Sequence, residues 1–138
     1  MGKIIISTKK SPAAIGPYSQ AIKVKGGITF TSGQIPLDPD TGNLVSGNFG
    51  EQVVQTLENI RGILEERNCG LSNLIKLTVY LTDLSNFDEL NSTFEDYWDE
   101  WFDENALHYP ARSAVEVSKL PKNAQVEIEA IFYDYDEN

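Results

Sequence analysis

The sequence contains a single cysteine, Cys69, and a single histidine, His108. One cysteine cannot form a disulfide within the chain, and one cysteine with one histidine argues against a Cys/His zinc site in one chain. A Ser-His-Asp triad would have to use His108, but no nucleophile motif stands near it. We therefore expect a protein of a reducing compartment, the cytoplasm; the same sequence is also compatible with a mitochondrial location.

Long apolar runs are absent as well. A membrane-spanning helix needs about 20 consecutive apolar residues, and no stretch of this sequence approaches that length. The apolar segment near the start, Ile4–Ile6, is too short for the core of a signal peptide. We therefore expect no membrane partner.

Basic residues are few, since 11 Lys and Arg stand against 21 Asp and Glu and the net charge is −10. Proteins that bind nucleic-acid backbones need clustered basic side chains, so this charge argues against a nucleic-acid partner. The acidity is local, because eight acids and no base lie between Asp88 and Glu104 and three more acids lie at the end of the chain. The rest of the chain is close to neutral and carries several lysines near its start, Lys3, Lys9, Lys10, Lys23 and Lys25. RNA binding therefore stays open as an alternative.

Length and composition favour one globular domain over residues 1–138, with residues 133–138 as an acidic C-terminal extension. Alternation and turn residues predict strands at residues 3–7, 21–25, 28–32, 74–81, 112–118 and 124–133, and helices at residues 51–67 and 86–101. Gly26-Gly27 predicts a tight turn between two of these strands. This order predicts an α+β fold, in which both helices cover one face of a mixed sheet.

Both predicted helices carry an apolar stripe. The stripes are Val53, Leu57, Ile60 and Leu64 in the first helix and Phe87, Leu90, Phe94, Trp98 and Trp101 in the second. Asn86 followed by Glu89 resembles a capping box at the start of the second helix, and Gly70 is placed to end the first.

The strands at residues 74–81 and 124–133 alternate between two chemically different faces. We expect the helices to cover the aliphatic face, which carries Ile75, Leu77, Val79 and Leu81 of the first of these strands. The opposite face is expected to carry Tyr80, Arg112, Glu127 and Glu129 among apolar neighbours. Such a face is too apolar to be left to water, so we expect a homo-oligomer that buries much of it.

Two charged residues on that second face are candidates for chemistry. Arg112 begins a strand, and its guanidinium can hold a carboxylate through two parallel hydrogen bonds. Glu127 lies in a strand expected to be central, where a partly buried carboxylate can act as a general base on water. The alternatives are a structural salt bridge or an exposed position for Arg112, and an ordinary polar strand face for Glu127.

Two further segments suggest a small-ligand pocket. Tyr18 lies on a loop stiffened by Gly16-Pro17, where its ring can close over a planar ligand or simply pack on the domain. Ser32 and Gly33 end a strand, and exposed amides after Gly33 are able to receive an anion, although a glycine there also serves a turn.

Together these segments resemble one family. The motifs are Ala13–Gln20, Thr31–Pro36, Asp83–Asn91, Pro110–Ser113 and Val126–Ala130, in this order along residues 11–131. They resemble the Rid family, the reactive intermediate deaminases, which are also called the YjgF or liver perchloric-acid-soluble proteins.

The resemblance implies a chorismate-mutase-like fold and a homotrimer with a ligand cleft at each subunit interface. It also implies hydrolysis of reactive 2-enamine and 2-imine acids, such as 2-iminopropanoate and 2-iminobutanoate, to 2-oxo acids and ammonia. No cofactor and no metal is expected for this reaction.

The resemblance also assigns roles to residues. Arg112 matches the arginine that pairs with the substrate carboxylate, and Glu127 the glutamate that positions or activates water. Tyr18, Ser32, Gly33, Asn91 and Ala114 stand at positions that line the substrate cleft. Ala114 stands where many members have cysteine, so we expect no thiol-dependent regulation at this position. The loop at residues 103–109 is longer than usual.

Two other functions stay open at this point. Some relatives carry the label of endoribonuclease or translation inhibitor. A trimer that binds small carboxylates without turnover, or acts like a chaperone, would also use Arg112.

Overall fold

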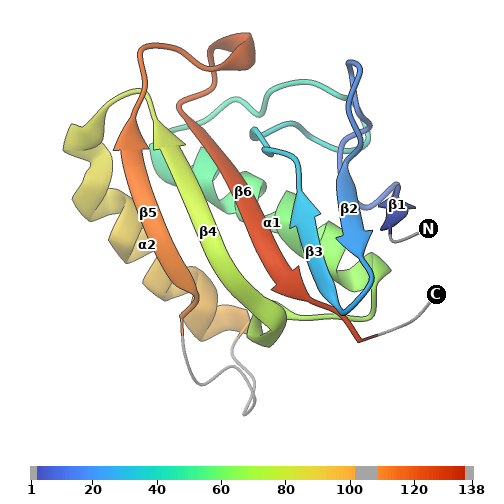
Figure 1. The fold of residues 1–138 in the computed structure, drawn as a ribbon. Coiled ribbons are helices and arrows are strands. Elements are labelled where there is room, and N and C mark those ends of the chain that lie inside the picture. The colour runs from blue at the N-terminus through green and yellow to red at the C-terminus, as the bar shows by residue number, and fades with distance from the viewer. Residues whose placement is uncertain (1–2, 102–108, 136–138) are drawn as a thin grey trace.

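The computed structural model describes residues 3–101 and 109–135. The elements are β1 (Lys3–Ile6), β2 (Ala21–Val24), β3 (Ile28–Thr31), α1 (Phe49–Glu66), β4 (Leu74–Leu81), α2 (Phe87–Trp101), β5 (Ala111–Glu116) and β6 (Val126–Tyr133), with the short 3-10 helices η1 (Leu71–Asn73), η2 (Leu84–Asn86) and η3 (Pro121–Asn123). The predicted α+β class is confirmed, and each predicted helix and strand is present with bounds within about two residues (Figure 1).

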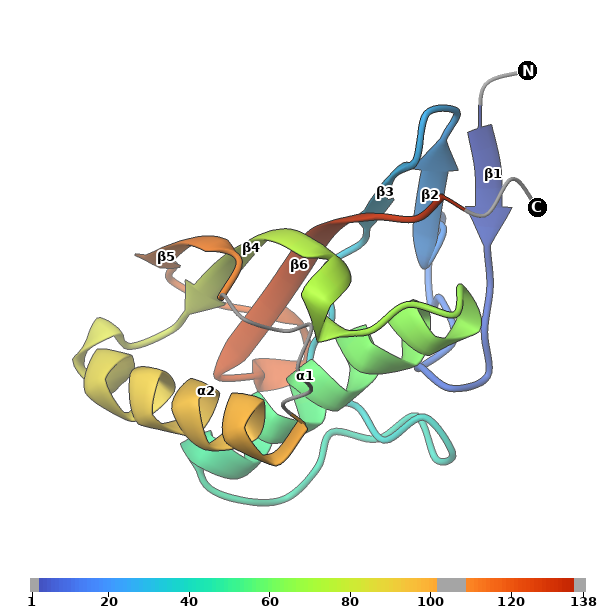
Figure 2. The same ribbon diagram turned by 90° about the horizontal axis from the view of Figure 1, so that it is seen from below.

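The six strands form one sheet in the order β1-β2-β3-β6-β4-β5. Neighbouring strands are antiparallel except β4 and β5, which are parallel because α2 connects them as a crossover. Figure 2 shows α1 and α2 on the same side of the sheet, as the sequence predicts. We call the other side the open face. None of the helices in the described part of the chain is long and apolar enough to span a membrane.

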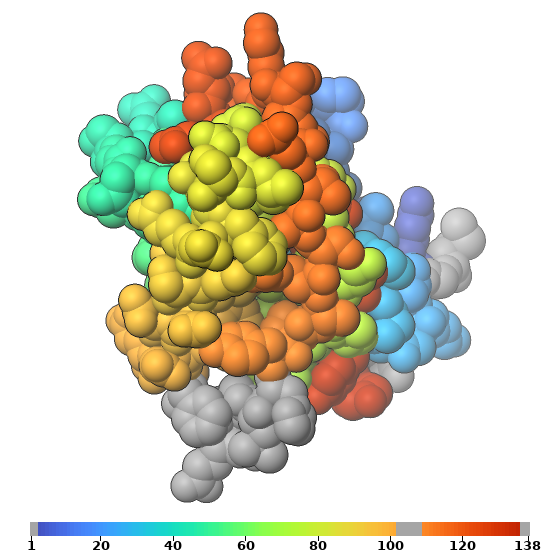
Figure 3. Space-filling model, turned by 90° about the vertical axis from the view of Figure 1, so that its left-hand side faces the viewer, coloured from blue at the N-terminus to red at the C-terminus, as the bar shows by residue number. Residues whose placement is uncertain are grey.

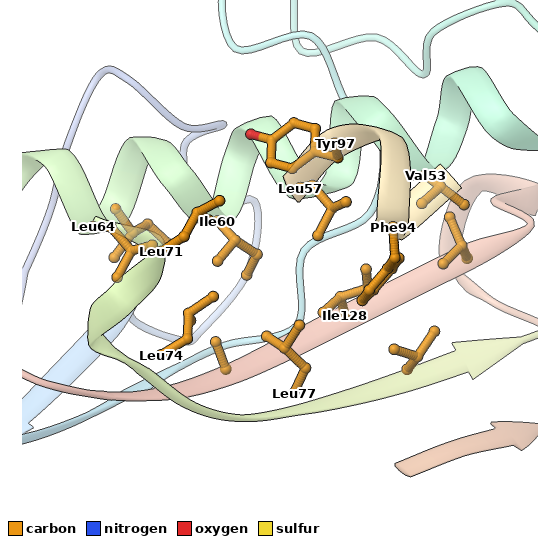
Figure 4. Close-up of a cluster of buried hydrophobic side chains, with 14 of the residues drawn as sticks. Val53, Leu57, Ile60, Leu64, Leu71, Leu74, Leu77, Phe94, Tyr97 and Ile128 are labelled. Carbon is orange, nitrogen blue, oxygen red and sulfur yellow. The ribbon is translucent and has the colours of Figure 1, made fainter. Parts of the chain in front are cut away.

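Helix α1 supplies the centre of the core. Val53, Leu57, Ile60 and Leu64 are all buried, and they pack with β4 and β6 side chains such as Leu77 and Ile128 (Figure 4). Asn48 begins the helix by accepting a hydrogen bond from the Glu51 N–H at 2.9 Å. The predicted stop at Gly70 is wrong. The helix ends at Glu66, and Asn68 in the left-handed conformation (φ 56°) turns the chain.

Helix α2 differs from its prediction at both ends. Asp83, rather than Asn86, caps this region by accepting a hydrogen bond from the Ser85 N–H at 2.9 Å, and Asn86 lies inside η2. The buried side chains are Leu90, Phe94, Tyr97 and Trp98, whereas Phe87 and Trp101 are each 39% exposed. The predicted stripe is therefore wrong at its ends, where Phe87 and Trp101 lie near the guanidinium groups of Arg112 and Arg61 instead of in the core.

The start of β4 contains an irregularity that reverses one prediction. The pairing of β4 with β6 shifts register between Leu74 and Lys76. Leu74 therefore takes the buried position, and Ile75 is 39% exposed instead of lying in the core. A strand with such a bulge no longer alternates strictly, which a pattern of apolar residues cannot show.

A buried ion cluster ties the end of β6 to the rest of the fold. Asp134, in the predicted acidic extension, is 1% exposed, and its carboxylate lies 2.6 Å from Arg67 Nε and 3.7 Å from Lys23 Nζ. Its N–H donates to the carbonyl of Gly27 at 2.6 Å. Lys23 is itself 4% exposed, so it does not belong to a basic surface for RNA.

Removing the negative charge of this cluster should destabilise the fold. The substitution Asp134→Asn leaves Lys23 buried without its counter-ion, and we expect a loss of about 3 kcal/mol in the free energy of unfolding in urea. The matched control Asp40→Asn removes an exposed carboxylate and should stay within about 0.5 kcal/mol of the wild type. Equal stability of Asp134→Asn and the control would contradict this view of the cluster.

Candidate active site

A cavity of about 550 Å³ opens between the Tyr18 loop, the segment after β3 and the open-face side of β6. Four residues singled out from the sequence line it: Tyr18, Ser32, Gly33 and Glu127. Glu129, which the sequence places two residues along the same strand, lines it as well. The structure thus brings together most of the pocket that the motifs predict.

Glu127 packs directly against Gly33. A Cβ added to Gly33 would lie only 2.7 Å from the Glu127 carboxyl carbon, so any larger residue would displace this carboxylate from its present position. A β-bridge holds the two segments together, because Gln34 and Ile128 exchange backbone hydrogen bonds of 2.8 and 3.0 Å. The Gln34 N–H therefore donates to the Ile128 carbonyl and is not available to an anion. The expectation that amides directly after Gly33 receive an anion is wrong for the amide of Gln34.

The hydroxyl of Ser32 binds the chain rather than the cavity. Its Oγ donates to the carbonyl of Ser19, and its N–H donates to the carbonyl of Gln20 at 2.9 Å. Tyr18 is 46% exposed, and its Oη accepts a hydrogen bond from the Ile15 N–H at 3.3 Å. Ser32 thus holds the loop that carries Tyr18 beside the cavity.

The sequence interpretation missed Gln20. Its side chain is buried, accepts the Thr8 N–H at 2.7 Å and donates to the carbonyl of Pro12 at 2.6 Å. It also lines the cavity. A glutamine that follows a loop of small residues was the only signal, and its role depends on contacts with residues 8 to 12 positions away.

Arg112 lies in a different place. Its Nη2 donates to Asn91 Oδ1 at 2.7 Å, and its guanidinium carbon lies 5.1 Å from the centre of the Phe94 ring and 5.5 Å from that of Phe87. These residues come from α2, which runs beside β5 at this edge of the molecule (Figure 3). A second cavity of about 400 Å³ is lined by Arg112, Asn91, Phe94 and neighbouring residues.

The guanidinium of Arg112 has no carboxylate partner among residues 3–101 and 109–135. Burial lowers its pKa, but a guanidinium remains charged in proteins. The alternative of a structural salt bridge is therefore not supported by the described residues. A charged, oriented and half-buried guanidinium without a counter-ion is well suited to a carboxylate ligand.

The expectation that Arg112 and Glu127 share one face of the sheet is wrong. In the parallel pair, Arg112 stands beside Leu77 and Ala114 beside Val79, so both point to the helix side, and Ala114 packs against the core. In the antiparallel pair, Glu127 stands beside Tyr80 on the open face. Within one chain the two charged groups therefore lie on opposite sides of the sheet.

The open face carries one more polar contact that the sequence did not predict. Tyr80 donates its hydroxyl proton to Glu129 Oε1 at 2.6 Å. Burial, and then the charge of Glu129, raise the pKa of Glu127 above its ordinary value. The cavity therefore holds a carboxyl group whose affinity for a proton is increased.

The described part of the chain contains no cluster of three or more His, Cys, Asp and Glu residues that could hold a metal ion. His108 and most of the predicted long loop at residues 103–109 lie outside the described residues. Cys69 is half-buried and is no part of either cavity.

The fold and its cavities define a small α+β protein with a carboxylate pocket on one side of its sheet and an arginine pocket on the other. The family model described as endoribonuclease L-PSP matches residues 8–133. The chain belongs to this family, which is the Rid or YjgF family that its motifs resemble.

Individual relatives are similar over nearly their whole length. A RutC family protein of Pyrococcus abyssi is 49% identical over 133 residues, which cover 96% of this chain and 98% of that protein. A 2-iminobutanoate/2-iminopropanoate deaminase of Salmonella typhimurium is 44% identical over 126 residues, covering 91% and 94%. The crystal structure of E. coli TdcF with bound serine has a TM-score of 0.85 and 39% identity, covering 94% of this chain and 98% of that one.

The raised pKa of Glu127 has a measurable effect on stability. In the unfolded chain this carboxyl ionises near its ordinary pKa of 4.5, whereas in the folded protein ionisation requires a higher pH. The wild type therefore loses stability relative to Glu127→Gln as the pH rises from 4.5 through the folded pKa. We expect urea unfolding to show that the free energy of unfolding of Glu127→Gln increases relative to that of the wild type as the pH rises above 4.5.

The control for this comparison is Glu66→Gln, which removes an exposed carboxylate from the same acidic protein. If both variants gained the same free energy of unfolding relative to the wild type, the effect would be due to net charge. If the gain of Glu127→Gln became smaller as the pH rises, the raised pKa of Glu127 would be contradicted.

Proposed function

We propose that this protein hydrolyses 2-imino acids, and their enamine tautomers, to 2-oxo acids and ammonia. The observation that carries the proposal is a pair of groups that form no ion pair among the described residues: the guanidinium of Arg112 and the carboxyl of Glu127. The similarity to the Salmonella typhimurium deaminase supports the reaction. The serine described in the E. coli TdcF structure supports a small 2-amino carboxylic acid as the kind of ligand.

The substrate carboxylate would bind to Arg112. A guanidinium offers two parallel N–H groups to a carboxylate, and Asn91 fixes the orientation of its plane by accepting a third. The rings of Phe87 and Phe94 lie within 5.5 Å of the guanidinium and exclude water from one side of it. The reactive carbon, one bond from the carboxylate, would then be held in a defined position.

Glu127 would move the protons. In the protonated imine the carbon is already electrophilic, so water attacks it as Glu127 takes one proton from the water, and a carbinolamine forms. Glu127 returns this proton to the amino nitrogen, the C–N bond breaks, and the hydroxyl proton leaves with the nitrogen as the carbonyl forms. The sum is one iminium and one water giving one 2-oxo acid and one ammonium ion, with Glu127 ionised again.

The proposed site needs two copies of the chain. Arg112 and Glu127 lie on opposite sides of one sheet, so a ligand that touches both must bridge neighbouring subunits. The open face carries exposed apolar side chains that a neighbour would cover, with Ile5 56%, Phe30 45% and Val115 43% exposed. We propose a homotrimer with one site at each interface, a cyclic arrangement in which every subunit gives one half-site and receives another.

The reaction is tested by coupling the protein to a pyridoxal-phosphate dehydratase that generates 2-aminoacrylate, and by following the release of pyruvate. We expect wild-type protein to speed this release, and Arg112→Lys to lower kcat/KM about 100-fold because lysine cannot form the two parallel hydrogen bonds. The control Arg61→Lys changes a residue that stacks on Trp101, outside both cavities, and should keep wild-type kinetics. Full activity of Arg112→Lys, or no effect of the wild type, would overturn the proposal; binding of pyruvate without turnover would favour a carboxylate-binding protein instead.

The shared site is tested by mixing two inactive variants. Arg112→Ala and Glu127→Gln each destroy one half-site, but an interface that joins the intact half of each variant is complete. Random assembly of equal amounts in a cyclic trimer makes about a quarter of the sites complete, so co-refolding should restore about that share of wild-type activity. Activity no higher than that of the separate variants would place both groups in one subunit or in no common site.

A further inference from the structure

The cavity holds two carboxyl groups in unequal surroundings. Glu127 and Glu129 are two residues apart in β6, so both point to the open face, and both line the same cavity. Glu129 accepts a hydrogen bond from Tyr80 Oη at 2.6 Å. Glu127 receives no hydrogen bond from any described residue and packs instead against Gly33.

The strand register places Tyr80 where it can make this contact. Tyr80 stands directly opposite Glu127, and Thr78 stands opposite Glu129, so the Tyr80 hydroxyl reaches the carboxylate diagonally across the two strands. The distance of 2.6 Å lies in the range typical of a hydroxyl that donates to a carboxylate oxygen. The same contact raises the pKa of Tyr80 above its ordinary value of 10.0, so its hydroxyl is a donor throughout the neutral range.

Two carboxylates in one pocket compete for ionisation. When the surroundings hold one of them charged, the second keeps its proton to a higher pH, which is the arrangement that divides acid and base roles in carboxylate pairs. We propose that Glu129, anchored by Tyr80, is a positioning residue for the reaction: its fixed negative charge keeps Glu127 able to take up and return a proton near neutral pH. This inference rests on the proposed function.

The other charged or titratable groups around Glu127 do not cancel this effect. Tyr18 lies at the cavity, Lys76 points to the open face from β4, and Lys122 follows a lining residue of η3. None of them forms an ion pair with Glu127 in the described part of the chain. In the proposed assembly Arg112 of a second copy also faces the site, and its charge is matched when the substrate carboxylate is bound.

The test compares pH profiles of kcat/KM for imine hydrolysis. The substitution Glu129→Gln removes the charge but keeps an oxygen that accepts the Tyr80 hydroxyl. We expect the acid limb of the profile to move about 0.5 to 1 pH unit lower, because Glu127 then ionises more easily, and the rate at neutral pH to fall about threefold. Ionisation of the substrate is the same for all variants and does not affect the comparison.

Two further variants separate a charge effect from a structural one. Tyr80→Phe keeps the ring but removes the hydrogen bond to Glu129, so the acid limb of its profile should move in the same direction by a smaller amount. In the double variant the shift should equal that of Glu129→Gln alone, because the two substitutions act through the same group. Glu100→Gln removes an exposed charge from α2 and should leave the limb unchanged. An acid limb that stays at its wild-type position in Glu129→Gln would overturn the inference.

A direct titration distinguishes this inference from the proposed function. Carbon-13 NMR of the Glu127 carboxyl, assigned with Glu127→Gln, needs no substrate and should show a midpoint that falls in Glu129→Gln. An unchanged midpoint in Glu129→Gln would overturn the coupling between the two carboxyl groups, whether or not the protein hydrolyses imines. If the wild-type protein did not hydrolyse imines, the proposed function and the catalytic use of the coupling would be overturned, but the coupling itself would not.

Discussion

The register of β4 against its two neighbours decides where every charged group of the sheet lies. β4 pairs Leu77 with Arg112 on one edge and Tyr80 with Glu127 on the other, and paired residues point to the same side. Because Leu77 and Val79 are fully buried, β4 cannot slip by one residue without moving its core side chains into water. The same apolar contacts that stabilise the fold therefore direct Arg112 toward α2 and Glu127 toward the open face.

This constraint connects packing with chemistry and assembly. A single chain presents an arginine half-site beside α2 and a carboxylate half-site beside the Tyr18 loop. Glu95 also lines the arginine half-site but forms no ion pair with the arginine among the described residues, and no described Lys or Arg lines the carboxylate half-site. The half-sites are well ordered by their own contacts: Asn91 orients the guanidinium, and Gly33 admits the Glu127 carboxyl. A complete site that contains both half-sites requires a second copy of the chain. The proposed activity therefore depends on the proposed trimer.

Local patterns predicted much of this fold. The α1 stripe from Val53 to Leu64 follows helical spacing, and Gly26-Gly27 does form the tight turn, with φ values of 111° and 98°. The misplaced residues are those whose surroundings come from distant segments. Ile75 is turned outward by an irregular pairing with β6, and Trp101 stacks with Arg61 of α1. The candidate residues were found through motifs, but their relation in space was not.

By itself the sequence determined the class of fold, the order of its elements, the family and the residue types available for chemistry, because helix and strand periodicities and short motifs are properties of neighbouring residues. Only the tertiary structure decided that Arg112 and Glu127 occupy opposite sides of the sheet, that Asp134 is a buried counter-ion, and that Tyr80 anchors Glu129. These facts depend on strand register and on contacts between segments far apart in the chain. A difference of one residue in register reverses the side on which a strand residue lies, and no local pattern records it.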